Sequence, residues 1–204
     1  MIVEMSYYWR ILYSGGDTPD LPTLLTKLPV QVCTWSAILM VFLLTTENDH
    51  LFDYCIYVCL TLGVVPLFTP AVIVTTGPTY YRYYQFWLEH MIPIYSCFYM
   101  MFIRDKKLKL KAIWKPFVPL LPGCFLSIYL NDKIPGANYF YLAQHTDGAS
   151  IANILPTNPI IRLLIYTGIA SALFFAEYGV FYLVHYLTNK YKTKKQKETD
   201  VVNS

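Results

Sequence analysis

The stretch YYQFWLEHMIPIYSC, residues 83–97, is aromatic and apolar enough to lie in a membrane, yet it holds an adjacent glutamate and histidine near its middle. A charged side chain at the centre of a bilayer costs about 2.5 kcal/mol or more. Such residues therefore usually face the interior of a helix bundle or a wet cavity. The stretch predicts a membrane helix with a polar face.

The composition of the whole chain agrees with a membrane location. Hydrophobic residues fill 55% of the 204 positions and charged residues only 14%, whereas a soluble domain has about 25% charged residues. Each crossing of a bilayer needs about 20 apolar residues, so the chain has room for about five or six helices. The composition predicts an all-α fold, a polytopic transmembrane helical bundle.

Five apolar segments are long enough to cross a hydrocarbon core of about 30 Å. Prolines inside the second, third and fourth segments predict kinks. We expect the bundle to occupy residues 27–188, after an N-terminal extracytoplasmic segment, residues 1–26, that contains a short interfacial or truncated helix. The predicted spans are residues 28–46, 51–75, 82–103, 112–130 and 160–187.

Two basic clusters predict the orientation of the chain. RDKKLKLK (104–111) and NKYKTKKQK (189–197) both flank apolar spans, as the positive-inside rule describes, which argues against nucleic-acid binding. Two spans separate the clusters, so both are expected on the cytoplasmic side of the cell membrane. Residues 189–204 are then a basic cytoplasmic tail, expected to be disordered after about Tyr191, and the loop 131–159 is extracytoplasmic.

The five cysteines all fall within apolar runs, so a disulfide framework is not expected. Cys55 and Cys59 lie one helical turn apart, but no histidine or carboxylate pattern completes a metal site. We predict packing roles for this pair, and expect no metal and no cofactor.

Polar residues form a stripe on the outer half of the third span. Arg82, Gln85 and Glu89 share one face of the helix, and His90 lies on the flank of that stripe. One interpretation is a structural hydrogen-bond network between helices, with Arg82 neutralising Glu89. The other is a functional site open to the outer leaflet.

Cys33 lies at a depth close to that of His90. At 1.5 Å per residue, the cysteine is about 7–8 Å and the histidine about 12 Å below the outer end of its span. They can meet if the first and third spans are neighbours, and the small residues Ser36 and Ala37 permit close approach. A cysteine and a histidine are the minimal nucleophile and base, because the histidine takes the thiol proton and the thiolate attacks an acyl carbon. Alone, Cys33 would be interpreted as a packing residue.

Two further candidates receive other roles. Cys97 lies about 10 Å from His90 along the same helix, which is too far for direct proton transfer. Glu177 is expected near or below the midplane, where it pairs with another helix or marks a polar path.

A series of short motifs occurs in a characteristic order over about residues 22–187. The order resembles that of the YwaF-type bacterial integral membrane proteins, which look like distant relatives of an animal transmembrane acyltransferase family. The motifs are LPVQVC (28–33), LFTP (67–70), YRYYQFWLEH (81–90), IWK (113–115), GANYFYL (136–142) and ILPTNP (154–159).

The resemblance implies an all-helical bundle in which an intramembrane cysteine carries an acyl group between phospholipids, with a membrane histidine as its partner. Carried over to this chain, these roles fall on Cys33 and His90. Asn138 and Tyr139 match the Asn-Tyr element of the family and are expected to cap the site. The family commonly reads Pro-x-His-x-Cys, whereas this chain has Gln31, which forms hydrogen bonds but does not titrate.

Two functions are compatible with these patterns. The first is acyl transfer or acyl hydrolysis on membrane lipids at a Cys33–His90 site, with the residues of the polar stripe orienting the histidine. The alternative is a non-catalytic accessory or scaffold subunit that binds a partner membrane protein or a lipid, which Gln31 and the short N-terminus favour. A small transporter is disfavoured, because five spans without inverted repeats are unusual for that class.

Overall fold

The computed structural model describes residues 25–26, 28–68, 77–143 and 154–202, which form helices and turns and contain no strand. The prediction of an all-α fold is therefore confirmed, and one long helix overlaps each predicted span. The interfacial helix expected within residues 1–26 lies almost entirely outside the described residues. The long helices are α3 (Val32–Thr46), α4 (Asp49–Phe68), α5 (Tyr81–Phe98), α6 (Phe117–Lys133) and α7 (Pro159–Val202). A π-helical turn, Tyr99–Ile103, extends α5, and 3₁₀ turns occupy Leu110–Trp114 and Tyr139–Tyr141.

Within the described residues, three helical segments are long and apolar enough to cross a membrane: α4, Leu110–Lys133 and Pro159–Tyr191. Helix α3 is shorter than predicted, with 15 residues or about 22 Å of length. It begins at Val32 because residues 28–31 form a turn, in which Val30 N–H donates to the Leu28 carbonyl at 2.7 Å. Cys33 is therefore the second residue of its helix.

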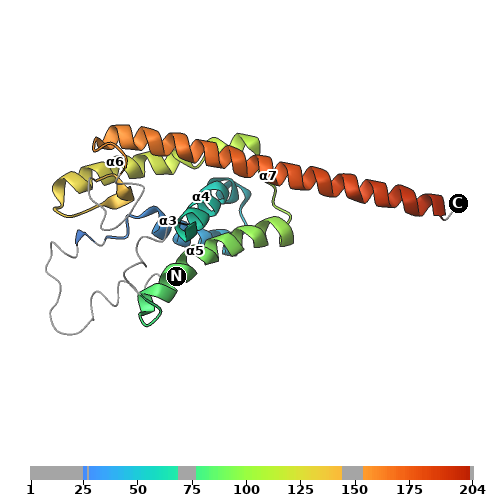
Figure 1. Ribbon diagram of the computed structural model, residues 1–204, viewed down its shortest axis with the longest axis horizontal. Coiled ribbons are helices and arrows are strands. Elements are labelled where there is room, and N and C mark those ends of the chain that lie inside the picture. The colour runs from blue at the N-terminus through green and yellow to red at the C-terminus, as the bar shows by residue number, and fades with distance from the viewer. Residues whose placement is uncertain (1–24, 27, 69–76, 144–153, 203–204) are drawn as a thin grey trace.

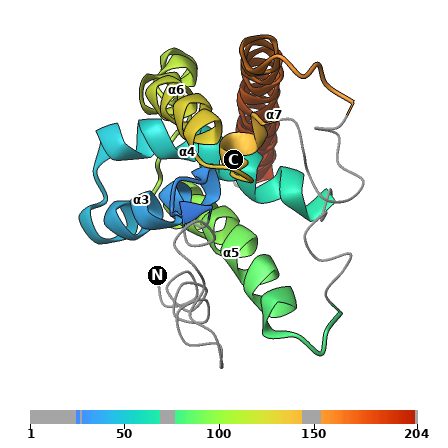
Figure 2. The same cartoon turned by 90° about the vertical axis from the view of Figure 1, so that its left-hand side faces the viewer.

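Helix α4 lies at the centre of the bundle. It contacts α3, α5 and α7, and the pair α6 and α7 runs along one side while α3 and α5 lie on the other (Figures 1 and 2). The core between these helices includes Met40, Phe52, Ile56 and Phe174. Large apolar side chains also remain exposed on the outer surface, for example Phe42, Tyr95, Val118 and Leu164. An apolar exterior of this kind suits a lipid environment.

The expectation of disorder after Tyr191 is wrong for the residues up to Val202, because α7 continues to that point. No glycine or proline follows Gly179 in the helix, and the lysines, glutamine and glutamate of the tail are good helix formers. The C-terminal part of α7 extends beyond the other helices (Figure 1).

Ion pairs connect the acidic residues at 47–53 with the basic residues at 104–115, and we call this region the ion-pair end. It brings the start of α4 together with the segment between α5 and α6. The pairs are Arg104–Glu47, Lys106–Asp49, Lys109–Asp53 and Lys115–Asp53. The opposite end holds residues 28–31, 134–143 and 154–158, and we call it the loop end. The side of the membrane that each end faces stays a prediction.

Candidate functional site

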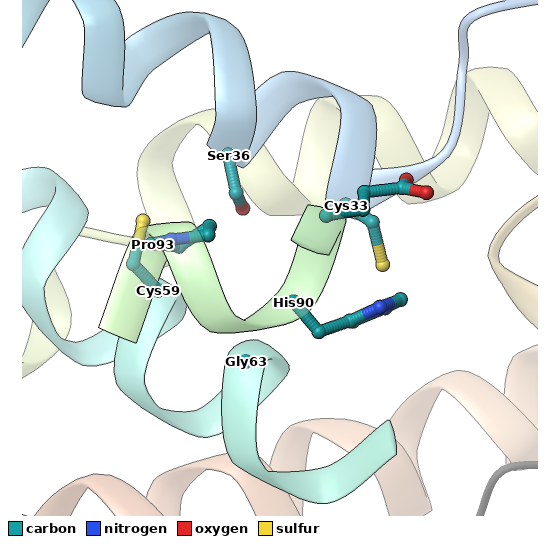
Figure 3. A pocket seen from close by; sticks show the side chains of 7 residues that line it. Cys33, Ser36, Cys59, Gly63, His90 and Pro93 are labelled. Atoms are coloured by element: carbon teal, nitrogen blue, oxygen red, sulfur yellow. The ribbon is translucent and has the colours of Figure 1, made fainter. Parts of the chain in front are cut away.

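A small pocket lies where α3, α4 and α5 meet (Figure 3). The pocket has a cavity volume of about 10 Å³, which is about the space that a single water molecule requires. Its lining residues are Cys33 and Ser36 from α3, Cys59 and Gly63 from α4, and Glu89, His90 and Pro93 from α5.

Cys33 and His90 lie on the walls of this one pocket. Helices α3 and α5 are in contact, so the neighbour relation that the depth argument required is present. In Figure 3 the Cys33 sulfur and the His90 ring lie toward the same part of the pocket. Cys33 is partly exposed and His90 is buried, so the thiol lies nearer the surface than the imidazole.

The His90 ring is oriented by its own helix. Nδ1 lies 2.8 Å from the Phe86 carbonyl oxygen, and the Phe86 ring packs against the imidazole with centroids 4.5 Å apart. A carbonyl oxygen only accepts hydrogen bonds, so Nδ1 carries the proton and donates. Nε2 of the neutral ring therefore bears the lone pair that can accept a proton.

The sequence predicts that the polar stripe orients His90, and it does not reveal the Phe86 carbonyl as a further partner. Glu89 lines the pocket, and Gln85 is fully buried but does not line it. Arg82 belongs to α5, but its side chain lies outside the described residues. The contact of His90 with the Phe86 carbonyl depends on a side-chain rotamer, which spacing along a helix does not reveal.

Gly63 allows α4 to approach α5 closely beside His90. A Cβ atom at this position would lie 2.5 Å from Ile94 Cγ1 and 3.0 Å from the His90 carbonyl oxygen. Both distances are shorter than ordinary van der Waals contact. The glycine therefore sets how tightly the α4 wall of the pocket closes on the histidine.

Gln31, Asn138 and Tyr139 form a separate cluster at the loop end. Gln31 Nε2 donates to the Asn138 carbonyl at 3.3 Å, and Gln31 Oε1 accepts from Phe140 N–H at 3.1 Å. The Tyr139 hydroxyl accepts from Leu28 N–H at 3.1 Å and donates to the Leu25 carbonyl. Burial raises the pKa of Tyr139, so its hydroxyl stays protonated as a donor. The cluster holds the loop against the start of α3, and none of its members lines the pocket.

Arg162, at the loop end, is not among the residues to which the sequence assigns a role. A lone arginine at the start of an apolar span is nevertheless a sign of a structural or functional site. Arg162 is 1% exposed and donates to backbone carbonyls on two segments. Arg162 binds the segment that contains Phe140 and Tyr141. Both of these residues have φ of +54°, a left-handed conformation that is strained for bulky side chains. The accepting carbonyls belong to Tyr141 (3.1 Å), Ala143, Leu155 (3.4 Å) and Pro156 (3.2 Å).

Glu177 joins α7 to α4. The Thr61 hydroxyl donates to Glu177 Oε1 at 2.7 Å, so the carboxyl group contacts a second helix and does not line the pocket. Within the described residues, no group of three or more histidine, cysteine or carboxylate side chains has an arrangement that could hold a metal ion. All five cysteines are free thiols.

An all-helical chain with an apolar exterior, three described segments long enough to cross a bilayer and ionisable groups turned inward is a multi-pass membrane protein. Comparison with family models agrees: residues 1–178 match the TMEM164 family. The chain therefore belongs to the TMEM164 family. The matched range includes every residue that lines the pocket and ends within α7.

No curated protein and no solved structure matches the chain. The family match bears on the class of membrane protein, and it does not support the YwaF-type assignment specifically. That finer assignment stays a prediction.

Proposed function

We propose that the pocket is an acyl-transfer site for membrane lipids, with Cys33 as the nucleophile and His90 as the base. The observation that carries this proposal is that the thiol and the imidazole line one pocket. The bond of Nδ1 to the Phe86 carbonyl makes Nε2 the atom with the proton-accepting lone pair. The resemblance to an animal transmembrane acyltransferase family points to the same chemistry.

The reaction divides into two balanced steps. His90 Nε2 takes the Cys33 thiol proton, and the sulfur attacks the ester carbon of a lipid. The carbon–oxygen bond to the lipid alcohol breaks, and that oxygen takes the proton from the imidazolium, leaving an acyl thioester on Cys33. A second lipid hydroxyl, or water in hydrolysis, then loses its proton to His90 and attacks the thioester, and the thiolate leaves and is reprotonated.

The size of the pocket limits how this chemistry proceeds. It admits about one water molecule, so a lipid ester enters only when α3, α4 and α5 separate. Closure around the thioester then excludes water and favours transfer over hydrolysis. The presence of Gln31 is compatible with His90 acting alone as the base, because the Gln31 amide bonds to the loop end and does not line the pocket.

The test uses the purified full-length chain in lipid nanodiscs that contain a phospholipid with a fluorescent acyl chain. We expect a fluorescent adduct on Cys33, located by peptide mass spectrometry and released by hydroxylamine as a thioester. Cys33→Ala and His90→Ala should abolish it, and Cys124→Ala, a buried cysteine outside the pocket, should not. Equal labelling of wild type and Cys33→Ala would overturn the proposal.

The alternative function is that of a non-catalytic subunit that binds a partner membrane protein or a lipid. The extension of α7 beyond the other helices favours it, because a projecting helix offers a docking arm. Cross-linking and co-purification test this alternative. A stoichiometric partner, together with full cellular function of Cys33→Ser, would support it over the enzyme.

For the orientation, we propose that the ion-pair end and the C-terminus face the cytoplasm of a cell-membrane protein. Its basic segment, residues 104–115, carries the positive charge that favours the inner side. A C-terminal epitope tag should then resist protease added to intact cells. Its digestion without lysis would reverse the orientation.

A further inference from the structure

Ser36 presents a buried hydroxyl group to the pocket. Its side chain is 4% exposed, and in Figure 3 it points into the pocket from α3. Its Oγ has no hydrogen-bond partner of ordinary geometry among the described residues. The Cys59 thiol lies beside it, but sulfur is a weak hydrogen-bonding partner. A buried polar group in this state is uncommon and calls for a functional explanation.

The position of Ser36 relative to Cys33 suits a specific role. The two residues are three positions apart in α3, so their side chains leave the same face of the helix with Cβ atoms about 5–6 Å apart. Both line the pocket, and His90 faces them from α5. We expect the oxygen of an acyl group on the Cys33 sulfur to come within reach of the Ser36 hydroxyl, because both side chains line the same pocket.

We propose that Ser36 is the oxyanion donor of this site. As the Cys33 sulfur bonds to the ester carbon, the carbonyl π electrons move onto oxygen, and the Ser36 O–H group donates a hydrogen bond to that oxygen. The O–H bond stays intact, and the hydrogen bond is released when the carbonyl forms again. The inference rests on the proposed acyl-transfer function, and it adds a catalytic residue that the cysteine–histidine pair alone does not include.

A competing interpretation is that Ser36 is only a small residue that lets helices approach. Ser36→Ala separates the two, because alanine is equally small and lacks only the hydroxyl. One donor to an oxyanion contributes about 100-fold or more in rate, whereas a residue needed only for its size loses nothing on this change.

The experiment compares two reactions of the same thiol in the full chain in nanodiscs. Alkylation of Cys33 by iodoacetamide needs the thiolate but forms no oxyanion, whereas acylation by a p-nitrophenyl fatty ester passes through one. Both rates are read at the Cys33 peptide by mass spectrometry. Ser96→Ala is the matched control, because Ser96 is a buried serine bonded to the Ile92 carbonyl and lies outside the pocket lining.

We expect Ser36→Ala to slow acylation about 100-fold and to leave alkylation unchanged, which also shows that the pocket is folded. Unchanged acylation, or an equal slowing of both reactions, would overturn the role of Ser36. If the wild-type Cys33 is alkylated but never acylated, the acyl-transfer function itself fails and the oxyanion donor with it. The pattern of the two rates distinguishes these outcomes.

Discussion

Each end of the bundle contains an arginine, and the two are held in opposite ways. Arg162 at the loop end is 1% exposed and donates to backbone carbonyls. Arg104 at the ion-pair end has a side chain that is 42% exposed and pairs with Glu47. The first fixes the course of the backbone, whereas the second neutralises charge at a surface.

Burial, more than charge, therefore decides which end of the bundle has a fixed backbone position. Exposed ion pairs are screened by salt and contribute little to stability. A buried charged donor is costly to remove, because several charge-assisted bonds are lost at once and water only partly reaches the acceptors. At the loop end such bonds hold the strained conformation of Phe140 and Tyr141 and attach the loop to the start of α3, next to Cys33.

The largest effect is expected from Arg162→Ala, which removes the buried guanidinium that donates to carbonyls on two segments. We predict a loss of about 3 kcal/mol or more in the free energy of unfolding, measured by denaturant titration in micelles. Arg162→Lys is the control: it keeps the charge but lacks the planar fork of donors, so it should recover less than half of the loss. A loss below about 1 kcal/mol would remove the basis of the comparison.

Asp53→Asn separates the effect of burial from the effect of location, because Asp53 belongs to the ion-pair end and is nevertheless buried. Its carboxylate accepts from Lys115 Nζ at 2.6 Å while its side chain is 5% exposed. We predict a destabilisation of about 1–3 kcal/mol in the same titration. Asp132→Asn, at an exposed pair with Lys133, is the matched control and should leave the midpoint unchanged. Equal behaviour of the two variants would show that burial does not separate them.

Gln31→Ala tests the neutral part of the loop end. It removes the two bonds that join α3 to Asn138 and Phe140, and we predict a loss of about 1–2 kcal/mol. Gln31→Glu keeps the acceptor and loses the donor, so it should fall between the variant and wild type. Asn189→Ala, on the exposed part of α7, serves as the control. No effect of Gln31→Ala would mean that the amide bonds do not anchor the loop.

The smallest effect is expected from Arg104→Ala. Its pair with Glu47 is exposed, so we predict no resolvable shift of the unfolding midpoint at physiological salt, and a shift that emerges only at low salt. The neighbouring Glu47 raises the pKa of Arg104, so the charge is present at every pH suitable for the titration. A large, salt-independent shift would contradict the assignment of this pair to the screened surface.

The helices were readable from the sequence because long apolar runs depend only on local composition. Their bounds were less accurate where tertiary or turn geometry intervened. The turn at residues 28–31 delays the start of α3, and α7 continues to Val202 because its polar residues are themselves good helix formers.

The candidate pair was also accessible from the sequence, since depth and family resemblance both pointed to Cys33 and His90. Three features of the site were not accessible. The Phe86 carbonyl that orients His90 depends on a rotamer. The hydroxyl of Ser36 is a candidate donor because it lacks a hydrogen-bond partner of ordinary geometry among the described residues, which residue spacing does not show. The sequence does not distinguish Gly63 from the other glycines, because its role depends on the close approach of Ile94.

Residue type and order alone predict an all-helical membrane protein with ionisable residues in its third span. Those properties follow from residue type and spacing, because these directly determine which segments leave water for the membrane. The packing of the helices sets which polar residues line a common pocket and which bind a loop. Cys33 and His90 line one pocket, while Gln31, two residues before Cys33, bonds to the loop end. Gln31 lies in the extended turn before α3 and Cys33 lies inside the helix, so their side chains leave the backbone in different directions.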